Sequence, residues 1–404
     1  MSGLASFLPV AILAFVFVLS LVVVVHELGH YWAARMFGTR IDQFSIGFGR
    51  SLVHWRDKHG VEWRIAWIPL GGYVRFSGDE NAASVPDQDD LTSLKAAIVE
   101  REGPGAEKAY FQFKPIWQRA VITAAGPIAN FILAIALFAV LLGAFGELTL
   151  PARISAVQPG TPAAAAGFQA GDLVREADGK TIRGWIELSQ YIQMRARQPI
   201  TFTVDRGGQT VNLTATPIPD MIENRIAGRI EVGKLGVAPP DRSEVVRVRY
   251  NPIEAVAVGA ERTWDVLSTT VFYIGRIITG KAPADQIGSI LGIGNTAGHV
   301  AQAGAAGHSN APDMLFGSVV ALLGLAAVLS VSVGFMNLLP LPVLDGGHLL
   351  FYAYEAVARR PLPGHVQAVA YRLGLALLVG FMLFATWNDL QRLGVVKFLG
   401  GLFS

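Results

Sequence analysis

Two histidines and a glutamate fall within five consecutive positions near the start of the chain. His26, Glu27 and His30 form a His-Glu-Leu-Gly-His segment in which the histidines are four residues apart. Residues four apart lie on one face of a helix, so both imidazoles can point at one ion. Glu27 follows the first histidine, where the H-E-x-x-H pattern places the general base of a zinc hydrolase. We therefore predict that His26 and His30 bind Zn2+ and that Glu27 is the catalytic base.

The apolar sequence before this segment strengthens the metal hypothesis. A hydrophobic run that starts near Leu4 leads into it, and roughly 20 such residues suffice to cross a bilayer. Each ionisable side chain at the centre of a span costs about 2.5–3.5 kcal/mol on insertion scales, so three polar groups together need a compensating partner. A divalent cation supplies one. The competing interpretation places these side chains at the membrane interface, where water satisfies them.

A second candidate segment lies at the end of the third apolar run and reads Asn-Leu-Leu-Pro-Leu-Pro-Val-Leu-Asp-Gly-Gly-His from Asn337. Pro340 and Pro342 are expected to break the helix. Asp345 is costly among apolar residues unless it meets a cation, so we predict that it is the third ligand. His348 is a rival ligand that we interpret as a bystander. We expect Asn337 to bind the substrate backbone or the oxyanion, with a helix cap as the alternative.

The composition indicates a membrane protein and limits the possible metal ligands. The chain has 404 residues, of which 52% are hydrophobic and only 16% are charged, an apolar balance for a soluble protein. The net charge of +2 favours no strongly charged partner, and we expect no nucleic acid to bind. Because the chain lacks cysteine, disulfides and thiolate sites are excluded, and His, Asp and Glu remain as the strong ligands.

Four stretches have the length and composition of transmembrane helices, which predicts a polytopic α-helical membrane protein. They cover residues 4–32, 120–145, 314–337 and 373–387. The first lacks the basic region and cleavage site of a signal peptide, so we expect it to be retained. Arg35, Arg40 and Arg50 follow it. The positive-inside tendency therefore predicts that the loop after the first span and the active site face the cytoplasm.

The first cytoplasmic loop contains a stretch that is typical of β structure. In residues 61–76, β-branched and aromatic side chains flank Gly71 and Gly72, which predicts a hairpin around the glycines with Pro69 on an edge. We expect a re-entrant, membrane-associated β-hairpin whose free edge, with these glycines, binds an extended substrate. The alternative is a solvent-exposed hairpin with no role. The polar residues 77–109 predict a mobile loop.

The segment between the second and third spans contains a predicted α+β domain. From Pro159, the stretch Pro-Gly-Thr-Pro-Ala-Ala-Ala-Ala-Gly-Phe-Gln-Ala-Gly-Asp resembles the PDZ domains of bacterial envelope proteases. Such a domain could bind a peptide end or act only as a spacer. An amphipathic helix is expected from Asn251 onwards. The predicted regions are residues 1–145 with two spans and the hairpin, 146–240 as a periplasmic PDZ domain, 241–312 as an amphipathic helical segment, and 313–404 with two further spans.

The order of these motifs resembles the site-2 protease family. The His-Glu pair, the Gly-Pro-Ile-Ala-Asn segment ending at Asn130, the single PDZ-like domain and the segment ending at Asp345 occur in the family's order. Helix packing is the role we favour for Asn130 itself. Two departures concern substrate gating. Enteric relatives carry two PDZ domains, and the family's Gly-Pro-Ile-Gly-Ile stretch reads Gly-Ser-Ile-Leu-Gly-Ile from Gly288.

The resemblance implies an intramembrane zinc endopeptidase of the bacterial inner membrane. Its substrates would be single-span membrane proteins, namely an anti-sigma factor of the envelope stress response and remnant signal peptides. One alternative is a non-catalytic, PDZ-bearing membrane receptor with a structural metal or none. Another is a membrane metalloprotease class with a downstream Glu ligand, which lacks both the PDZ insertion and the Leu-Asp-Gly-Gly segment.

Overall fold

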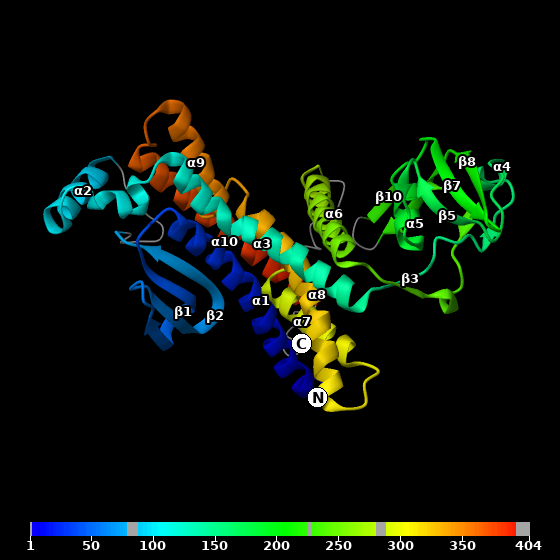
Figure 1. Ribbon diagram of the computed structural model, residues 1–404, viewed down its shortest axis with the longest axis horizontal. Coiled ribbons are helices and arrows are strands. Elements are labelled where there is room, and N and C mark those ends of the chain that lie inside the picture. The colour runs from blue at the N-terminus through cyan, green and yellow to red at the C-terminus, as the bar shows by residue number, and fades with distance from the viewer. Residues whose placement is uncertain (1, 79–87, 225–227, 280–287, 393–404) are drawn as a thin grey trace, which may run out of the picture. The chain divides into compact units, whose positions relative to one another are not determined.

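The computed structural model describes residues 2–78, 88–224, 228–279 and 288–392 (Figure 1). Contacts between Cα atoms separate the chain into two compact units. The first unit comprises Met1–Val140, Val256–Val271 and Asp285–Ser404, and the second comprises Leu141–Ala255 and Phe272–Ala284. All predicted catalytic, metal-binding and substrate-binding residues lie in the first unit.

Within the described residues, four helices are long and apolar enough to cross a membrane. They are α1 (Ser2–Met36), α3 (Ile116–Phe145), α8 (Ala311–Asn337) and α10 (Gly364–Arg392). Their number and order agree with the four predicted spans, which confirms the class of membrane protein. Helix α10 begins well before the predicted residues 373–387 because the polar residues around Gln367 continue the same helix.

Small and β-branched residues pack the helices of the first unit together. Val18 and Val22 of α1 are 1% exposed and share one buried cluster with Ala326 of α8. The cluster also contains Ala297 of α7 (Ile290–Ala305), which contacts both α1 and α8. The Gly- and Ala-rich sequence after Gly288 therefore forms a helix whose small side chains allow its neighbours to approach closely.

A two-stranded antiparallel sheet follows α1 and is formed by β1 (Ile41–Arg56) and β2 (Glu62–Phe76). The predicted position of the hairpin turn, around Gly71 and Gly72, is wrong because both glycines lie inside β2. The turn is made instead by Asp57. Its Oδ1 accepts hydrogen bonds from the backbone N–H groups two and four residues further on, at 2.8 and 3.0 Å. Gly60 completes the turn with a φ of 84°, a backbone conformation that favours glycine.

The hairpin curls so that its last residues form an edge of the sheet. Phe44 of β1 lies opposite Val74 on one side and opposite Trp63 on the other. The end of β2 therefore has a strand partner on one side only within the described part of the chain. Both strands contact α1, and the curled ribbon lies beside that helix in Figure 1. The hydroxyl of Tyr31 in α1 donates to Asp57 at 3.4 Å and ties the turn to this helix.

The prediction of a mobile loop over residues 77–109 is wrong for its second half. Residues 79–87 lie outside the described part, but α2 (Gln88–Glu102) is a helix. Ile98 of α2 is 2% exposed, and the carboxylate of Glu102 accepts a hydrogen bond from the Tyr110 hydroxyl at 2.8 Å. The burial of Ile98 and the hydrogen bond of Glu102 are tertiary contacts that stabilise this polar helix. The composition of the segment does not indicate them.

The predicted break before Asp345 is present. No helix or strand covers residues 338–344, which contain Pro340 and Pro342, and α9 (Asp345–Ala358) begins directly at Asp345. An aspartate in the first turn of a helix is stabilised by the helix dipole. The guanidinium of Arg119 in α3 pairs with the carboxylate of Glu355 in α9 at 2.7 Å. This ion pair links the far end of α9 to α3.

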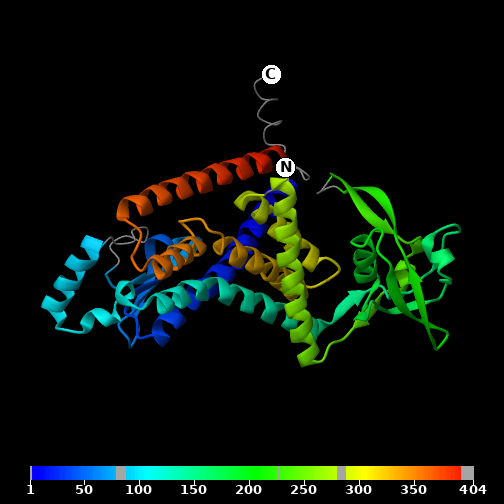
Figure 2. The ribbon, with the colours of Figure 1, turned by 90° about the horizontal axis from the view of Figure 1, so that it is seen from above.

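Figure 2 shows α10 as the orange-to-red helix. It makes polar contacts with the rest of the first unit at two places along its length. Towards one end, the Tyr371 hydroxyl lies 2.6 Å from Nε2 of His348 in α9. Towards the other, the buried carboxylate of Asp389 accepts hydrogen bonds from the backbone N–H of Ser289 and Gly292 at 2.6 and 2.8 Å. Asp389 thereby caps the start of α7, whose first N–H groups have no partner within that helix.

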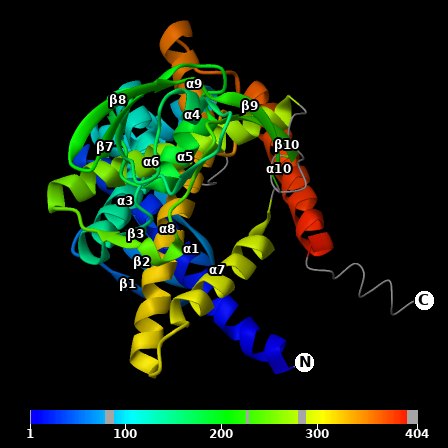
Figure 3. The same cartoon turned by 90° about the vertical axis from the view of Figure 1, so that its right-hand side faces the viewer.

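The second unit contains an antiparallel sheet in the strand order β6-β5-β7-β8. The strands are β5 (Leu173–Ala177), β6 (Lys180–Thr181), β7 (Ile200–Arg206) and β8 (Gln209–Ala215), and α5 (Trp185–Gln193) packs on the sheet. Ile200, Phe202 and Val204 of β7 are fully buried in its core. A separate ribbon of β9 (Ile218–Asn224) and β10 (Gly228–Lys234) lies apart from β7 and β8 in Figure 3. These elements fall in the region predicted as a PDZ domain.

The remaining elements of the second unit are short strands, turns and the start of a long helix. Strand β3 (Glu147–Thr149) pairs with β12 (Val246–Val248), and β4 (Ala156–Val157) pairs with β11 (Val237–Ala238). Helix α6 (Pro252–Ile278) begins after Asn251, whose side chain accepts a hydrogen bond from the Glu254 N–H in a capping box. This start agrees with the helix predicted from Asn251, because Asn at the cap with Glu three residues later satisfies the first free N–H groups.

Candidate metal centre

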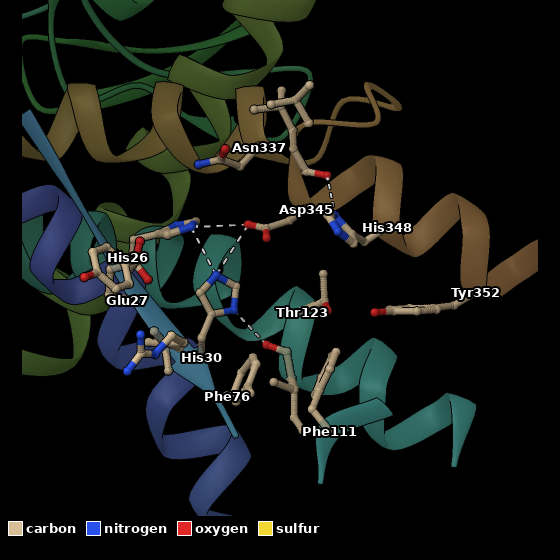
Figure 4. A pocket seen from close by; sticks show the side chains of 16 residues that line it. His26, Glu27, His30, Phe76, Phe111, Thr123, Asn337, Asp345, His348 and Tyr352 are labelled. Atoms are coloured by element: carbon tan, nitrogen blue, oxygen red, sulfur yellow. Dashed lines mark hydrogen bonds and ion pairs between the residues drawn. The ribbon is translucent and has the colours of Figure 1, made fainter. Parts of the chain in front are cut away.

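The structure brings His26, His30 and Asp345 together (Figure 4). Nε2 of His26 lies 3.2 Å from Oδ2 of Asp345, and Nε2 of His30 lies 3.5 Å from the same oxygen. The two Nε2 atoms are 3.2 Å apart. The histidines come from consecutive turns of α1, and the aspartate comes from the first turn of α9. Segments from opposite ends of the chain therefore meet at one point.

The geometry of these three atoms fits a tetrahedral zinc ion. Two ligands that each lie about 2.0–2.1 Å from a tetrahedral zinc are roughly 3.3–3.4 Å apart, and the observed separations of 3.2, 3.2 and 3.5 Å agree. Oδ2 of Asp345 is buried and accepts no hydrogen bond from any described residue. Facing lone pairs on two imidazoles and a carboxylate repel unless a cation or protons lie between them. The donor set of two His and one carboxylate is typical of catalytic zinc.

Residues of helix α3 contact the rings of both histidines. Nδ1 of His30 donates to the backbone carbonyl of Ile122 at 2.9 Å, which leaves the Nε2 lone pair free to bind a metal. The side-chain amide of Asn130 lies 3.2 Å from Nδ1 of His26. Gly126 permits this approach, because a Cβ atom at this position would lie 2.3 Å from Nε2 of His30. The Gly-Pro-Ile-Ala-Asn segment thus contacts both imidazole rings.

Glu27 lies between the metal centre and the edge of β2. Its carboxylate accepts a hydrogen bond from the backbone N–H of Val74. A Cβ atom on Gly72 would lie 3.0 Å from Cγ of Glu27, so only glycine lets this strand run so close to the side chain. The sheet edge and the candidate base are therefore in direct contact. Gly71, in contrast, faces the ring of Phe48, which would lie 2.3 Å from a Cβ atom at this position.

A cavity of about 380 Å³ contains the candidate ligands and the base. Its wall includes Asn337, His348 and Thr123, together with residues from the end of β2. The hydroxyl of Thr123 and the ring of Tyr352 lie on the same side of the cavity in Figure 4. In the described part of the chain, Gly71, Gly72, Pro340 and Pro342 are not among the lining residues. Of these four, only Gly72 touches the base.

His348 lies outside the cluster of possible ligands. Its Nδ1 is 3.2 Å from the backbone carbonyl of Leu344, and its Nε2 faces the hydroxyl of Tyr371. Both ring nitrogens are therefore occupied by protein partners, in line with its interpretation as a bystander. Sequence reasoning did not find the contacts of Asn130 and Ile122 with the histidines. The only available signal was the Gly-Pro-Ile-Ala-Asn segment, which does not reveal what it packs against.

Comparisons with known proteins show the family of the chain. Residues 14–381 match peptidase family M50. The chain is 54% identical to the metalloprotease MmpA of Caulobacter vibrioides over 397 residues, which are 98% of this chain and 99% of that protein. It is 29% identical to the regulator of sigma-E protease RseP of Salmonella typhimurium over 474 residues, which cover 94% of this chain and 98% of that protein.

Among solved structures, the PDZ domain of an SdrC-like protein from Listeria innocua aligns with 23% of this chain and 98% of its own length. The sequence identity is 18% and the TM-score is 0.19, so this likeness supports no conclusion. The family match, in contrast, spans most of the chain, and the relatives align over nearly their full length. The chain therefore belongs to peptidase family M50, the site-2 proteases, and is a zinc metalloprotease of the membrane.

Proposed function

We propose that the protein cuts single-span membrane proteins within the bilayer, with His26, His30 and Asp345 as zinc ligands and Glu27 as the general base. The observation that carries this proposal is the meeting of two imidazoles and one carboxylate, all within 4.8 Å of one another. Both histidines lie on a helix that is apolar enough to span a membrane. Such a cluster in an apolar helix is expensive without a cation.

The chemistry follows from the positions of these residues. A bound zinc supplies Lewis acidity, which polarises a carbonyl group and makes water more acidic. Glu27, beside the cluster, takes the proton from the attacking water and later gives it to the leaving amine. Asn337 lines the same cavity, which supports the proposed role of its amide in donating to the substrate carbonyl oxygen as negative charge develops there.

The edge of β2 supports binding of the substrate in an extended form. A peptide bond inside a helix is shielded by its neighbours, so a transmembrane substrate must unwind locally before it is cut. The end of β2 has a free side that borders the cavity, and a strand added there would reach Glu27 and the metal ligands. We propose that Gly72 lets this edge approach Glu27 closely. Gly71 and the loop that contains Pro340 and Pro342 are proposed to lie around the edge where the substrate binds.

The topology and the substrates are part of the same proposal. Basic residues after α1 favour a cytoplasmic site and a periplasmic second unit in the bacterial inner membrane. The proposed regions are those predicted above, with residues 146–240 as a PDZ domain that excludes substrates with bulky external parts. Similarity to a regulator of sigma-E protease supports an anti-sigma factor as a substrate, and remnant signal peptides fit the same single-span class.

The test compares purified protein in proteoliposomes with a single-span substrate labelled at both ends. Glu27→Gln keeps the size of the side chain but removes its basicity. We expect it to retain zinc and to lose cleavage by at least about 10²-fold, the usual contribution of a general base. His26→Ala should lose both zinc and cleavage. Cleavage by Glu27→Gln at the wild-type rate would show that another group is the base.

A further inference from the structure

Asn130 contacts Nδ1 of His26, the ring nitrogen that does not face the metal cluster. It lies in α3, is fully buried, and its amide nitrogen as placed is 3.2 Å from Nδ1 of His26. Its carbonyl oxygen Oδ1 is also buried and has no hydrogen-bond partner among the described residues. A buried amide with one end against a metal-binding imidazole needs an explanation beyond helix packing.

The role of the ring nitrogens decides which end of the amide faces the histidine. Nε2 of His26 points at Asp345 and at Nε2 of His30. If this Nε2 binds a metal, the neutral ring carries its proton on Nδ1, and Nδ1 must donate. Only Oδ1 of Asn130 can then accept. The oxygen and nitrogen atoms of an amide are assigned from their hydrogen-bond partners. Exchanging the two atoms in Asn130 points Oδ1 at the Nδ1–H group of His26 and the NH₂ group away from it.

The backbone around Asn130 is held firmly, so the amide is a fixed partner. The hydroxyl of Ser330 in α8 donates to the backbone carbonyl of Asn130 at 2.8 Å. A Cβ atom on Gly334 of α8 would lie 3.2 Å from Cβ of Asn130, which shows how closely the two helices approach. His30 is held differently, because its Nδ1 donates to a backbone carbonyl that no side-chain substitution removes. Only His26 depends on a side chain.

We propose that Asn130 is a positioning residue that holds His26 in its metal-binding tautomer and orientation. Its Oδ1 accepts the Nδ1–H of His26, so that the Nε2 lone pair faces the metal. The proposal rests on the assignment of His26 as a zinc ligand. A hydrogen bond of this kind orients the ligand and raises its basicity, and its loss typically weakens metal binding by about 10–100-fold.

The experiment measures zinc affinity of the full-length, detergent-purified protein by competition with a chelator. Asn130→Leu keeps the number and branching of the side-chain heavy atoms but cannot accept a hydrogen bond, and it should bind zinc about 10–100-fold more weakly. Asn130→Asp keeps an acceptor and should bind zinc at least as tightly as the wild type. Ser332→Ala is the matched control, since it removes a hydroxyl of the same helix that donates to the backbone carbonyl of Val328 at 3.1 Å and leaves the hydrogen bond between Ser330 and Asn130 in place. It should leave zinc affinity unchanged.

A purely structural role makes a different prediction. Both Asn130 variants would then lower the thermal stability of the zinc-free protein, and neither would change zinc affinity selectively. Wild-type affinity in Asn130→Leu, or equal losses in the Leu and Asp variants, would overturn the proposal. If His26→Ala itself keeps full zinc affinity, the assignment of the ligand fails rather than the role of Asn130.

A second measurement on the wild type does not depend on the folding of any variant. In ¹⁵N spectra of zinc-loaded protein labelled at histidine, the proposal requires two metal-bound rings that both carry a proton on Nδ1. His30 supplies one through its contact with the Ile122 carbonyl, and His26 must supply the other. Finding only one such ring would show that His26 does not bind the metal through Nε2, and the ligand assignment on which the proposal rests would be wrong.

Discussion

Replacing Gly72 by alanine tests whether the sheet edge sets the position of the candidate base. The added Cβ would lie 2.8 Å from the backbone oxygen of Ser45, 3.0 Å from Cγ of Glu27 and 3.3 Å from Cγ1 of Val23. Ordinary contacts between carbon atoms are about 3.5–4.0 Å, so strand and side chain must separate by roughly 0.5–1 Å. Gly72 does not have a positive φ, so alanine adds volume without straining the backbone.

The expected result is a selective loss of catalysis. Misplacement of a reacting group by about 1 Å can reduce a rate by about 10²-fold, so we expect kcat/KM to fall by about 10–100-fold. Zinc content should stay at the wild-type level because the contacts of the new methyl group are with Glu27, Ser45 and Val23 and not with the metal ligands. The assay is the initial rate of cleavage of a single-span substrate in proteoliposomes, with zinc measured on the same samples.

Gly380→Ala in α10 is the matched control. A Cβ atom at this position meets no other atom within 4 Å, so the same substitution should leave both rate and zinc content unchanged. Wild-type activity of Gly72→Ala would refute the idea that β2 positions Glu27. Loss of zinc in Gly72→Ala would show that the strand supports the metal ligands rather than the base.

Three further predictions concern stability. Asp389→Ala removes the cap of α7 and leaves the Ser289 and Gly292 N–H groups without their acceptor. Thermal unfolding should show that the free energy of unfolding falls by about 1–3 kcal/mol. The control Asp313→Ala, at an exposed helix start, should lower it by less. Arg119→Ala leaves the half-buried carboxylate of Glu355 without its ion-pair partner, and we expect the free energy of unfolding to fall by about 1–3 kcal/mol, the range for hydrogen bonds to charged groups; an unchanged melting temperature would contradict this. Burial raises the pKa of Asp172, but hydrogen bonds from Arg206 and the Gln169 N–H lower it below the ordinary value. Because the folded pKa is lowered, this carboxylate stabilises the second unit above the unfolded pKa, and the stabilisation is lost as pH falls below about 4. Hydrogen exchange in β5 and β7 should become faster as this stabilisation is lost. Arg206→Gln should remove most of the pH dependence. Exchange in the wild type that is independent of pH after correction for the intrinsic rate would contradict the prediction.

The candidate ligands and the membrane class could be predicted because their signals are local. The spacing of two histidines on one helix is enough to predict that they share a ligand site. Length and composition are enough to predict the apolar spans. Asp345 could be predicted because a lone carboxylate in an apolar segment is costly. The sequence does not contain the distances that bring it to the histidines, and these distances come from the packing of α9 against α3 through Arg119 and Glu355.

The errors lie where tertiary contacts decide the structure. Gly71 and Gly72 are typical of a turn, but here glycine is required because β2 approaches Glu27 and Phe48 closely. The turn instead uses Asp57 together with Gly60 at positive φ, a signal that the more prominent Gly-Gly pair obscured. Helix α2 is polar and depends on contacts such as those of Ile98 and Glu102. Asn130 is typical of helix packing, and only the fold reveals that it faces a candidate metal ligand.

The most direct test of the metal centre is X-ray absorption at the zinc edge, combined with zinc content, for wild type and Asp345→Ala. The wild type should hold one zinc per chain with only nitrogen and oxygen ligands, at about 2.0–2.1 Å, since the chain has no cysteine. Asp345→Ala should lose the ion or show an altered set of oxygen ligands. A full complement of zinc with an unchanged spectrum in Asp345→Ala would contradict the claim that α1 and α9 bind one metal together.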